Sequence, residues 1–221
     1  MNQASLLHKA ALSFGERPAV TAGRNVLYNY RDLSDRAARL GGAMANALGL
    51  NKGDRVAIMM KNAPAFFEVL YGAWHAGLNA VPINANLHPR EAAYILENSG
   101  ARVCFITDDL NATITPLVGE IPGLEAVIPT TGADYDALIE GPAVPMVDCA
   151  PEDIAWLFYT SGTTGRPKGA RMTYGMAVYN SVHCSMTMSL TEASKNIVFL
   201  PTFHTGGLNV YANPMFHTGG T

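Results

Sequence analysis

One glycine- and hydroxyl-rich stretch dominates the chain: Tyr159-Thr160-Ser161-Gly162-Thr163-Thr164-Gly165-Arg166-Pro167-Lys168-Gly169. It follows the apolar run Ile154–Phe158, which predicts a buried strand. The stretch holds four serine or threonine hydroxyls, three glycines and two cationic side chains, and no acid. Glycines let successive backbone N–H groups turn toward one anion, and hydroxyls and a lysine add further donors. The sequence therefore predicts a loop that holds phosphates.

Two other interpretations of this stretch can be weighed from the residues. A solvated Gly/Ser/Thr connector would not need hydroxyls, glycines and cations directly behind a buried strand. The P-loop of NTPases reads G-x-x-x-x-G-K-[ST]. Counting back from Lys168 places Pro167 where that motif requires glycine, and Gly169 replaces the magnesium-binding hydroxyl. The stretch is therefore not a Walker-type loop.

From Tyr159 to Gly169 the chain matches the signature [YF]-T-S-G-[TS]-T-G-x-P-K-G throughout. It thereby resembles the AMP-forming adenylating enzymes, which include acyl-CoA synthetases, luciferases and the adenylation domains of peptide synthetases. The resemblance implies that the ATP phosphates are held by Thr160, Ser161, Gly162, Thr163, Thr164, Gly165 and Lys168. It also implies Mg²⁺ and coenzyme A alongside ATP. Segments 28–33 and 71–84 resemble two earlier motifs of the same family.

Length and composition fit a protein with a sizeable apolar core. Of the 221 residues 48% are hydrophobic and 15% are charged. The net charge of −3 gives no electrostatic basis for binding nucleic acid or an acidic membrane. The widely spaced Cys104, Cys149 and Cys184 predict reduced thiols of a cytoplasmic protein. The chain shows neither the apolar core of a signal peptide nor a run near the roughly 20 residues of a membrane span.

Strand-like and helix-like segments alternate before the signature. Strands are expected at 55–60, 79–83, 102–107 and 125–128, and helices at 5–14, 33–48, 64–76, 89–99, 111–119 and 134–139. Such alternation with short connections is typical of right-handed βαβ units on a parallel sheet. The predicted fold class is α/β, a mostly parallel sheet with flanking helices. By resemblance it is an incomplete N-terminal domain of an adenylate-forming enzyme.

We expect three parts along the chain. Residues 1–140 form a first βα subdomain, 141–150 a proline-containing connector, and 151–221 the phosphate loop with the start of the acyl-pocket region. In the third part Thr173 is expected to cap a helix that runs to about Leu190. No C-terminal domain is expected in these residues.

A second informative segment spans Ile197–Asn209, where a predicted strand ends at Pro201 and is followed by a histidine and a glycine-opened helix. It resembles the family segment P-x-[FY]-H-x-x-G, which implies that His204 and Gly206 contact the carboxylic-acid substrate. Amino-acid-activating relatives carry an acidic residue near this point. Because His204 supplies no fixed negative charge, the resemblance favours a fatty or aromatic acid that lacks an α-amine. His217 is assigned to the following turn.

The later family motifs, Y-G-x-[TS]-E, T-G-D, the hinge and the C-terminal lysine, do not occur in these 221 residues. The resemblance implies ATP-dependent activation of a carboxylic acid to acyl-adenylate and then acyl-CoA by a parent protein. We expect the isolated chain to be inactive, and we assign it no catalytic residue and no metal ligand. An aryl- or amino-acid ligase, a non-catalytic nucleotide- or partner-binding module and assembly with a separately encoded C-terminal half stay open. Apolar faces left uncovered would favour a homo-oligomer.

Overall fold

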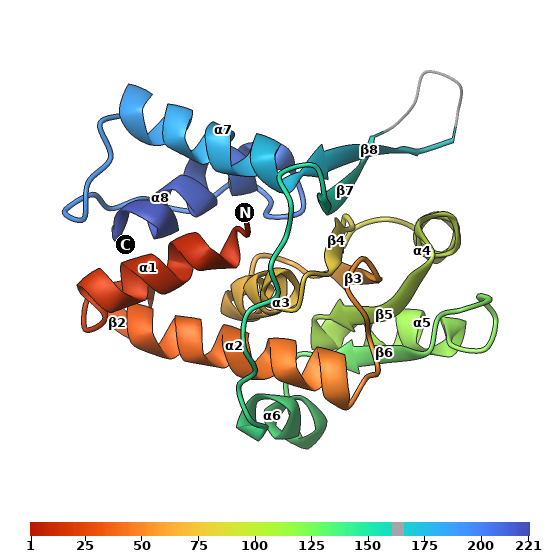
Figure 1. The fold of residues 1–221 in the computed structure, drawn as a ribbon. Coiled ribbons are helices and arrows are strands. Elements are labelled where there is room, and N and C mark those ends of the chain that lie inside the picture. The colour runs from red at the N-terminus through yellow and green to blue at the C-terminus, as the bar shows by residue number, and fades with distance from the viewer. Residues whose placement is uncertain (161–165) are drawn as a thin grey trace.

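The computed structural model describes residues 1–160 and 166–221 (Figure 1). The helices are α1 (Ala4–Phe14), α2 (Tyr30–Asn46), α3 (Pro64–His75), α4 (Pro89–Ser99), α5 (Asn111–Ile114), α6 (Ala133–Glu140), α7 (Tyr174–Thr187) and α8 (Asn213–Thr218), with shorter or wider turns η1 (Asp108–Leu110), η2 (Thr115–Leu117) and η3 (Gly206–Ala212). The strands are β1 (Pro18–Ala22), β2 (Asn25–Asn29), β3 (Arg55–Met59), β4 (Asn79–Pro82), β5 (Ala101–Ile106), β6 (Ala126–Pro129), β7 (Ile154–Thr160) and β8 (Lys168–Thr173).

A six-stranded sheet in the order β6-β5-β3-β4-β7-β8 organises the described residues. Every neighbouring pair from β6 to β7 is parallel, and only β8 runs antiparallel, against β7. The strands β1 and β2 form a separate antiparallel hairpin. The mostly parallel α/β sheet predicted from the sequence is confirmed.

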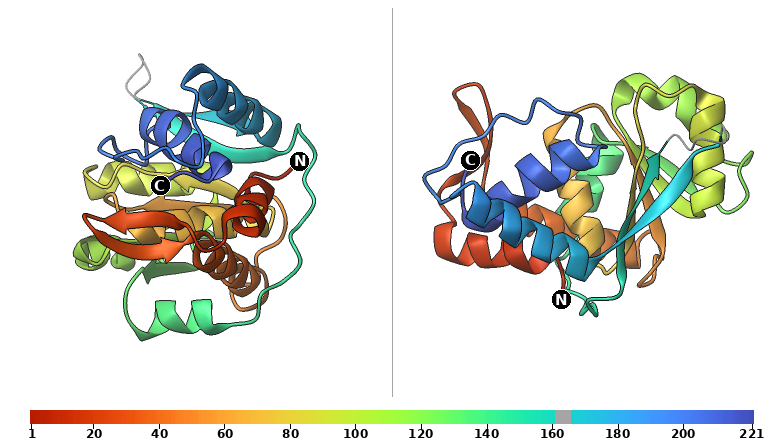
Figure 2. Two further views of the ribbon diagram at one scale, coloured as in Figure 1. Left: turned by 90° about the vertical axis from the view of Figure 1, so that its left-hand side faces the viewer. Right: turned by 90° about the horizontal axis from the view of Figure 1, so that it is seen from above.

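Helices cover both faces of this sheet (Figure 2). On β3, Val56 and Ile58 belong to one core cluster with α1, α2, α3 and α6, while Ala57 and Met59 belong to a second cluster with α4 and α5. Successive side chains of a strand point to opposite faces, so a continuous apolar strand is buried on both. This three-layer packing explains why the predicted strands read as apolar runs rather than as alternating patterns.

Local capping signals fix the helix ends. The helix α4 begins with Pro89 behind a capping box, in which His88 Nδ1 accepts from Arg90 N–H and Glu91 accepts from His88 N–H. It ends at Gly100, whose φ of 63° is the left-handed conformation that favours glycine. The sequence predicted these boundaries within one or two residues.

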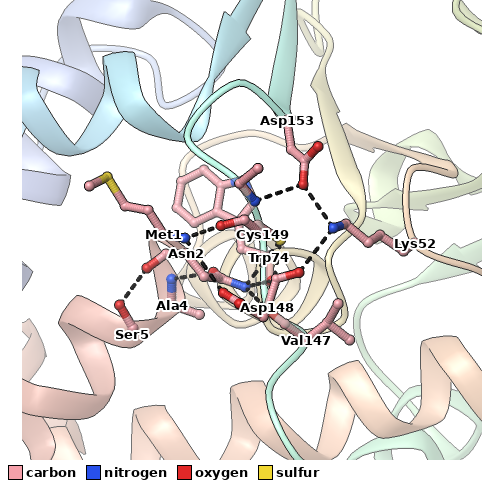
Figure 3. A network of polar contacts seen from close by, with 11 residues as sticks. Met1, Asn2, Ala4, Ser5, Lys52, Trp74, Val147, Asp148, Cys149 and Asp153 are labelled. Carbon is pink, nitrogen blue, oxygen red and sulfur yellow. Dashed lines mark hydrogen bonds and ion pairs between the residues drawn. The ribbon is translucent and has the colours of Figure 1, made fainter.

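The connector 141–150 contains no helix or strand and is tied down at its end by the start of the chain (Figure 3). Asn2 Nδ2 donates to the carbonyl oxygens of Trp74, 2.6 Å away, and Val147, 2.9 Å away. Lys52 Nζ forms an ion pair with Asp153, 2.8 Å away, at the entry to β7. These contacts fix the point at which the chain enters β7.

After the signature, one predicted strand does not form and one strand forms that was not predicted. The predicted strand at Ile197–Leu200 does not form: Ile197 and Phe199 are 78% and 66% exposed, and the segment pairs with no strand among the described residues. An apolar segment becomes a strand only where a sheet edge accepts its hydrogen bonds. Conversely, Lys168–Thr173 forms β8, where the sequence pattern predicts no strand. Its strand conformation comes from pairing with β7.

Two helices are shorter than expected. The predicted cap of α7 is confirmed, because Thr173 Oγ1 accepts from Met176 N–H at 3.2 Å, but the helix ends at Thr187 rather than near Leu190. The helix expected at 111–119 is reduced to α5 and the following η2 turn, which contains Pro116. Among the described residues no helix is both long enough and apolar enough to cross a lipid bilayer.

Candidate functional site

The signature stretch joins β7 to β8, which lie side by side at one edge of the sheet (Figure 1). The last residue of β7, Thr160, pairs with the first residue of β8, Lys168, and both side chains are exposed. The other five predicted phosphate-binding residues, Ser161, Gly162, Thr163, Thr164 and Gly165, lie outside the described residues. The structure therefore brings Thr160 and Lys168 together at the base of the loop.

Burial fixes the orientation of β7 up to this point. Trp156 and Phe158 pack into the cluster on the α3 side, and Leu157 and Tyr159 pack against the α4 side. Thr160 follows as the first exposed residue of the strand. A hydroxyl donor and an ammonium group thus stand opposite each other on a rigid support, an arrangement suited to holding an anion.

The segment that carries His204 opens η3 (Gly206–Ala212), as the predicted glycine-opened helix requires. His204 is exposed, and its Nδ1 accepts a hydrogen bond from Gly206 N–H at 3.2 Å. This bond assigns the proton of the neutral ring to Nε2, which is then a donor available to a ligand. His204 and Gly206 therefore act as one unit, with the glycine amide orienting the imidazole.

Asn62 holds this segment in place. Its Oδ1 accepts from Thr202 N–H at 2.9 Å and from the Thr202 hydroxyl at 3.2 Å, while its Nδ2 donates to the carbonyl oxygens of Leu200 at 2.9 Å and Val198 at 3.3 Å. The sequence pattern of Asn62 followed by Pro64 predicts Asn62 as the N-cap of α3, but Ala63 occupies that position. No sequence signal links residues so far apart in the chain.

The two adjacent glycines of this segment differ in how closely they are packed. A Cβ atom on Gly206 would meet His204 Nδ1 at 3.5 Å, an ordinary contact. On Gly207 it would lie 2.3 Å from the carbonyl oxygen of Pro201, which no side chain can tolerate. The predicted substrate contact is Gly206, whereas the backbone requires glycine at Gly207.

The helix α7 connects the β7–β8 hairpin to the segment 197–209, which carries His204 and is called the His204 segment below. It follows β8 directly and packs against β7, η3 and α8. Asn180 Nδ2 on α7 donates to the carbonyl oxygen of Asn209 in η3 at 2.7 Å. Among the described residues no hydrogen bond joins His204 or Gly206 directly to Thr160 or Lys168, and α7 is one element that contacts both parts of the candidate site.

A buried polar network lies behind η3. Tyr71 OH donates to Asn213 Oδ1 at 3.0 Å and lies 3.1 Å from His217 Nε2. Burial lowers the pKa of His217 to about 3, and its Nδ1 has no hydrogen-bond partner among the described residues. His217 sits inside α8 and not in the following turn as expected, because Gly219 is the residue that ends the helix.

The described residues contain no cluster of three or more His, Cys, Asp or Glu side chains that could hold a metal ion. The cysteines are free, and burial raises the pKa of the Cys104 thiol to about 12, so this thiol stays protonated at neutral pH.

The described residues form a mostly parallel α/β sheet in which β7 and β8 flank the signature stretch, and the segment that carries His204 follows α7. The AMP-binding enzyme family model matches residues 7–221, and the chain belongs to this family. The expected resemblance is confirmed over nearly the whole chain.

Curated relatives of the chain are CoA ligases. A feruloyl-CoA synthase of Amycolatopsis is 34% identical over 195 residues, covering 87% of this chain and 38% of the relative. The long-chain-fatty-acid–CoA ligase FadD13 of Mycobacterium tuberculosis is 32% identical over 211 residues, covering 92% of this chain and 41% of the relative. The chain thus spans about two fifths of the length of these proteins.

Solved structures agree with the fold. The ATP-bound MatB from Rhodopseudomonas palustris superposes with a TM-score of 0.85 at 26% identity, over 100% of this chain and 44% of that one. The fold of this chain is therefore similar to that of the solved structure.

Proposed function

We propose that this chain supplies the phosphate-binding hairpin and the start of the acyl site of an ATP-dependent acid–CoA ligase. The parent reaction would activate a carboxylic acid to an acyl-adenylate and then transfer the acyl group to coenzyme A. The pairing of Thr160 with Lys168 at the base of the family signature carries this proposal. Family membership and the CoA-ligase relatives support it.

In this account Thr160 and Lys168, with residues 161–165, hold the β- and γ-phosphates of ATP. Hydroxyl and amide donors together with one ammonium neutralise charge on the phosphates, which lowers the barrier to bringing two anions together. Mg²⁺, when bound with the nucleotide, supplies further charge neutralisation. His204 faces the acid through Nε2, and Gly206 holds the ring in that orientation.

The proposed substrate is a fatty or aromatic acid without an α-amine. Residues 193–221, which include the whole His204 segment, contain no aspartate or glutamate to pair with a substrate ammonium. The feruloyl-CoA synthase and the long-chain-fatty-acid–CoA ligase to which the chain is similar are named for acids of this kind. The free cysteines fit a reducing compartment, and we propose the cytoplasm.

Non-hydrolysable acyl-sulfamoyl adenosines test the substrate class. Thermal unfolding of the chain would be followed with a feruloyl, a long-chain acyl and an aminoacyl analogue. The first or second should raise the melting temperature, and the aminoacyl analogue should not. Stabilisation by the aminoacyl analogue alone would contradict the proposal and favour an amino-acid ligase.

A pyrophosphate-release assay with ATP, Mg²⁺ and a panel of fatty and aromatic acids tests the division of labour. We propose that the adenylate-forming lysine is absent from all three parts of the chain, 1–140, 141–150 and 151–221. Pyrophosphate release by the chain alone should therefore stay at background. Substantial turnover would contradict this assignment. Turnover that appears only on mixing with the remaining region of a relative would support it.

A further inference from the structure

Tyr159, the first residue of the signature, reaches out of its hairpin toward a helix. The alternation along β7 turns Tyr159 to the face of the sheet covered by α4. Its hydroxyl donates to Asn98 Oδ1, near the end of α4, at 2.8 Å. This hydrogen bond connects β7, the first strand of the hairpin, to α4 in the helix layer on that face of the sheet.

The last residue of the signature makes this reach feasible. Gly169 lies opposite Tyr159 in the register of β7 and β8. A Cβ atom on Gly169 would lie 3.1 Å from Tyr159 Cζ, because the aromatic ring lies over the glycine backbone. Because Gly169 has no side chain, the Tyr159 ring can lie over its backbone and extend to α4.

The residues that lead into β8, the second strand of the hairpin, contact α4 as well. The Arg166 guanidinium lies 5.7 Å from the centroid of the Tyr94 ring, a cation–π distance. Tyr94 OH donates to the carbonyl oxygen of Pro167 at 3.4 Å. Because Tyr94 and Asn98 are four residues apart, both project from the same face of α4.

The helix that makes these contacts is itself held firmly. Its opposite face buries Ala92, Ile95 and Leu96, each at most 2% exposed. Its ends are set by the capping box at His88 and by Gly100. Contacts from Tyr94 and Asn98 therefore fix both arms of the hairpin, β7 and the start of β8, relative to α4.

We propose that Tyr94 and Asn98 are positioning residues that hold both arms of the β7–β8 hairpin in register for binding the phosphates of ATP. We call Tyr94, Asn98, Tyr159, Arg166 and Pro167 the α4 clamp. The proposal rests on the proposed function for its nucleotide, but the clamp itself is a property of the described residues. A preorganised site binds more tightly because less ordering is required on binding.

The protonation states suit this role at neutral pH. Burial and the neighbouring Tyr94 raise the pKa of Tyr159 above its ordinary value, so its hydroxyl stays a donor. Asn98 and Arg166 are exposed and Tyr94 is half-buried, so nucleotide and solvent can reach the clamp from outside.

Hydrogen–deuterium exchange of the 155–160 and 166–173 backbone segments tests the clamp without any nucleotide. The variants are Asn98→Ala, Tyr159→Phe, their double mutant, and Asn98→Asp, which keeps the acceptor oxygen. Loss of one hydrogen bond should speed exchange in both segments about five-fold. The double mutant should exchange no faster than the singles, and Asn98→Asp should exchange slowly again. Glu97→Gln is the control, because Glu97 is exposed on the same helix and its side chain bonds no described residue.

Calorimetric titration with ATP and Mg²⁺ tests the functional consequence. Asn98→Ala should raise the dissociation constant about five-fold while the urea midpoint of global unfolding shifts little. On the other arm, Tyr94→Phe keeps the ring over Arg166 and should weaken binding less than Tyr94→Leu.

Unchanged exchange in Asn98→Ala and Tyr159→Phe would overturn the clamp. Faster exchange throughout the sheet, with a matching fall in the urea midpoint, would overturn a positioning role and show a general structural one. Failure of the unaltered chain to bind ATP would instead contradict the proposed function, and the exchange data would then show a clamp without a nucleotide role.

Discussion

Asn62 and Thr202 are separated by 140 residues and are joined by two hydrogen bonds, from the Thr202 amide and the Thr202 hydroxyl to one amide oxygen. The same Asn62 side chain donates to the carbonyl oxygens of Val198 and Leu200. Asn62, which precedes α3, therefore makes four hydrogen bonds to the stretch that leads to His204. In place of a strand ladder, one side chain satisfies its backbone groups.

Asn62→Ala should loosen residues 198–206 because four hydrogen bonds lose their partner. We expect about 1–2 kcal/mol lower stability and faster exchange of the Thr202 amide. Asn62→Asp keeps the acceptor for Thr202 and loses only the donors, so it should protect that amide more than alanine does. Equal exchange in all three proteins would contradict the role of Asn62.

Gly207→Ala should be far more damaging than Gly206→Ala. The added methyl would lie 2.3 Å from the Pro201 carbonyl oxygen in the first case and 3.5 Å from His204 Nδ1 in the second. We expect a loss of about 2 kcal/mol or more for Gly207→Ala and little change for Gly206→Ala, measured by urea unfolding. Similar losses for the two variants would show that the Gly207 backbone moves to accommodate the methyl group.

Stability should fall as the pH drops below about 6.5, partly because of His217. Burial lowers the pKa of His217 to about 3 in the folded protein, so between these pH values only the unfolded chain takes up this proton. The folded state then loses at most about 1.4 kcal/mol per pH unit from this residue. Urea midpoints at pH 7.5 and 5.5 measure the loss.

His217→Phe should reduce this acid sensitivity, although it also removes the contact with Tyr71. Some sensitivity should remain, because burial also lowers the pKa of His75. His183→Gln, a change at an exposed histidine, is the control and should leave the pH dependence unaltered. The same pH dependence in His217→Phe and the unaltered chain would contradict the assignment.

Self-association is expected through two exposed apolar regions, the outer face of α7 and the segment 197–199. The exposed apolar side chains there are Met176, Tyr179, Val182, Met186, Ile197 and Phe199, from 45% to 78% exposed. Clusters of exposed apolar side chains favour association. Light scattering should show a mass that rises with concentration.

Met186→Lys combined with Ile197→Lys should shift this protein toward the monomer. Leu12→Lys, at a side chain of similar exposure on α1, should leave the association unchanged. A monomer at every concentration of the unaltered chain would contradict the expectation.

The sequence predicted the parts of this fold that depend on local patterns. The apolar run of β7 and the capping signals of α4 are readable because neighbouring residues determine them. By contrast, Lys168–Thr173 has few buried side chains and is a strand only because β7 pairs with it. Ile197–Leu200 is apolar and pairs with no strand among the described residues. An apolar run alone therefore wrongly predicted a strand there.

The candidate site shows the same limit. Residue types predicted a phosphate-holding stretch, and the resemblance to the family signature named Thr160, Lys168 and the residues between them. The supports of the site, Asn62 for the His204 segment and Asn98 for Tyr159, lie 140 and 61 residues from their partners. Contacts at such separations leave no local pattern in one sequence, and only the packed layers bring them together.

Calorimetric titration of the chain with ATP and Mg²⁺, alongside Lys168→Ala and Arg171→Ala, tests the central claim most directly. Both substitutions remove one positive charge from β8, but Arg171 lies farther along the strand, beside a hollow it shares with Lys52. The account predicts binding by the unaltered chain, a loss of about ten-fold or more in Lys168→Ala, and unchanged affinity in Arg171→Ala. No binding by the unaltered chain, or an equal loss in both variants, would contradict it.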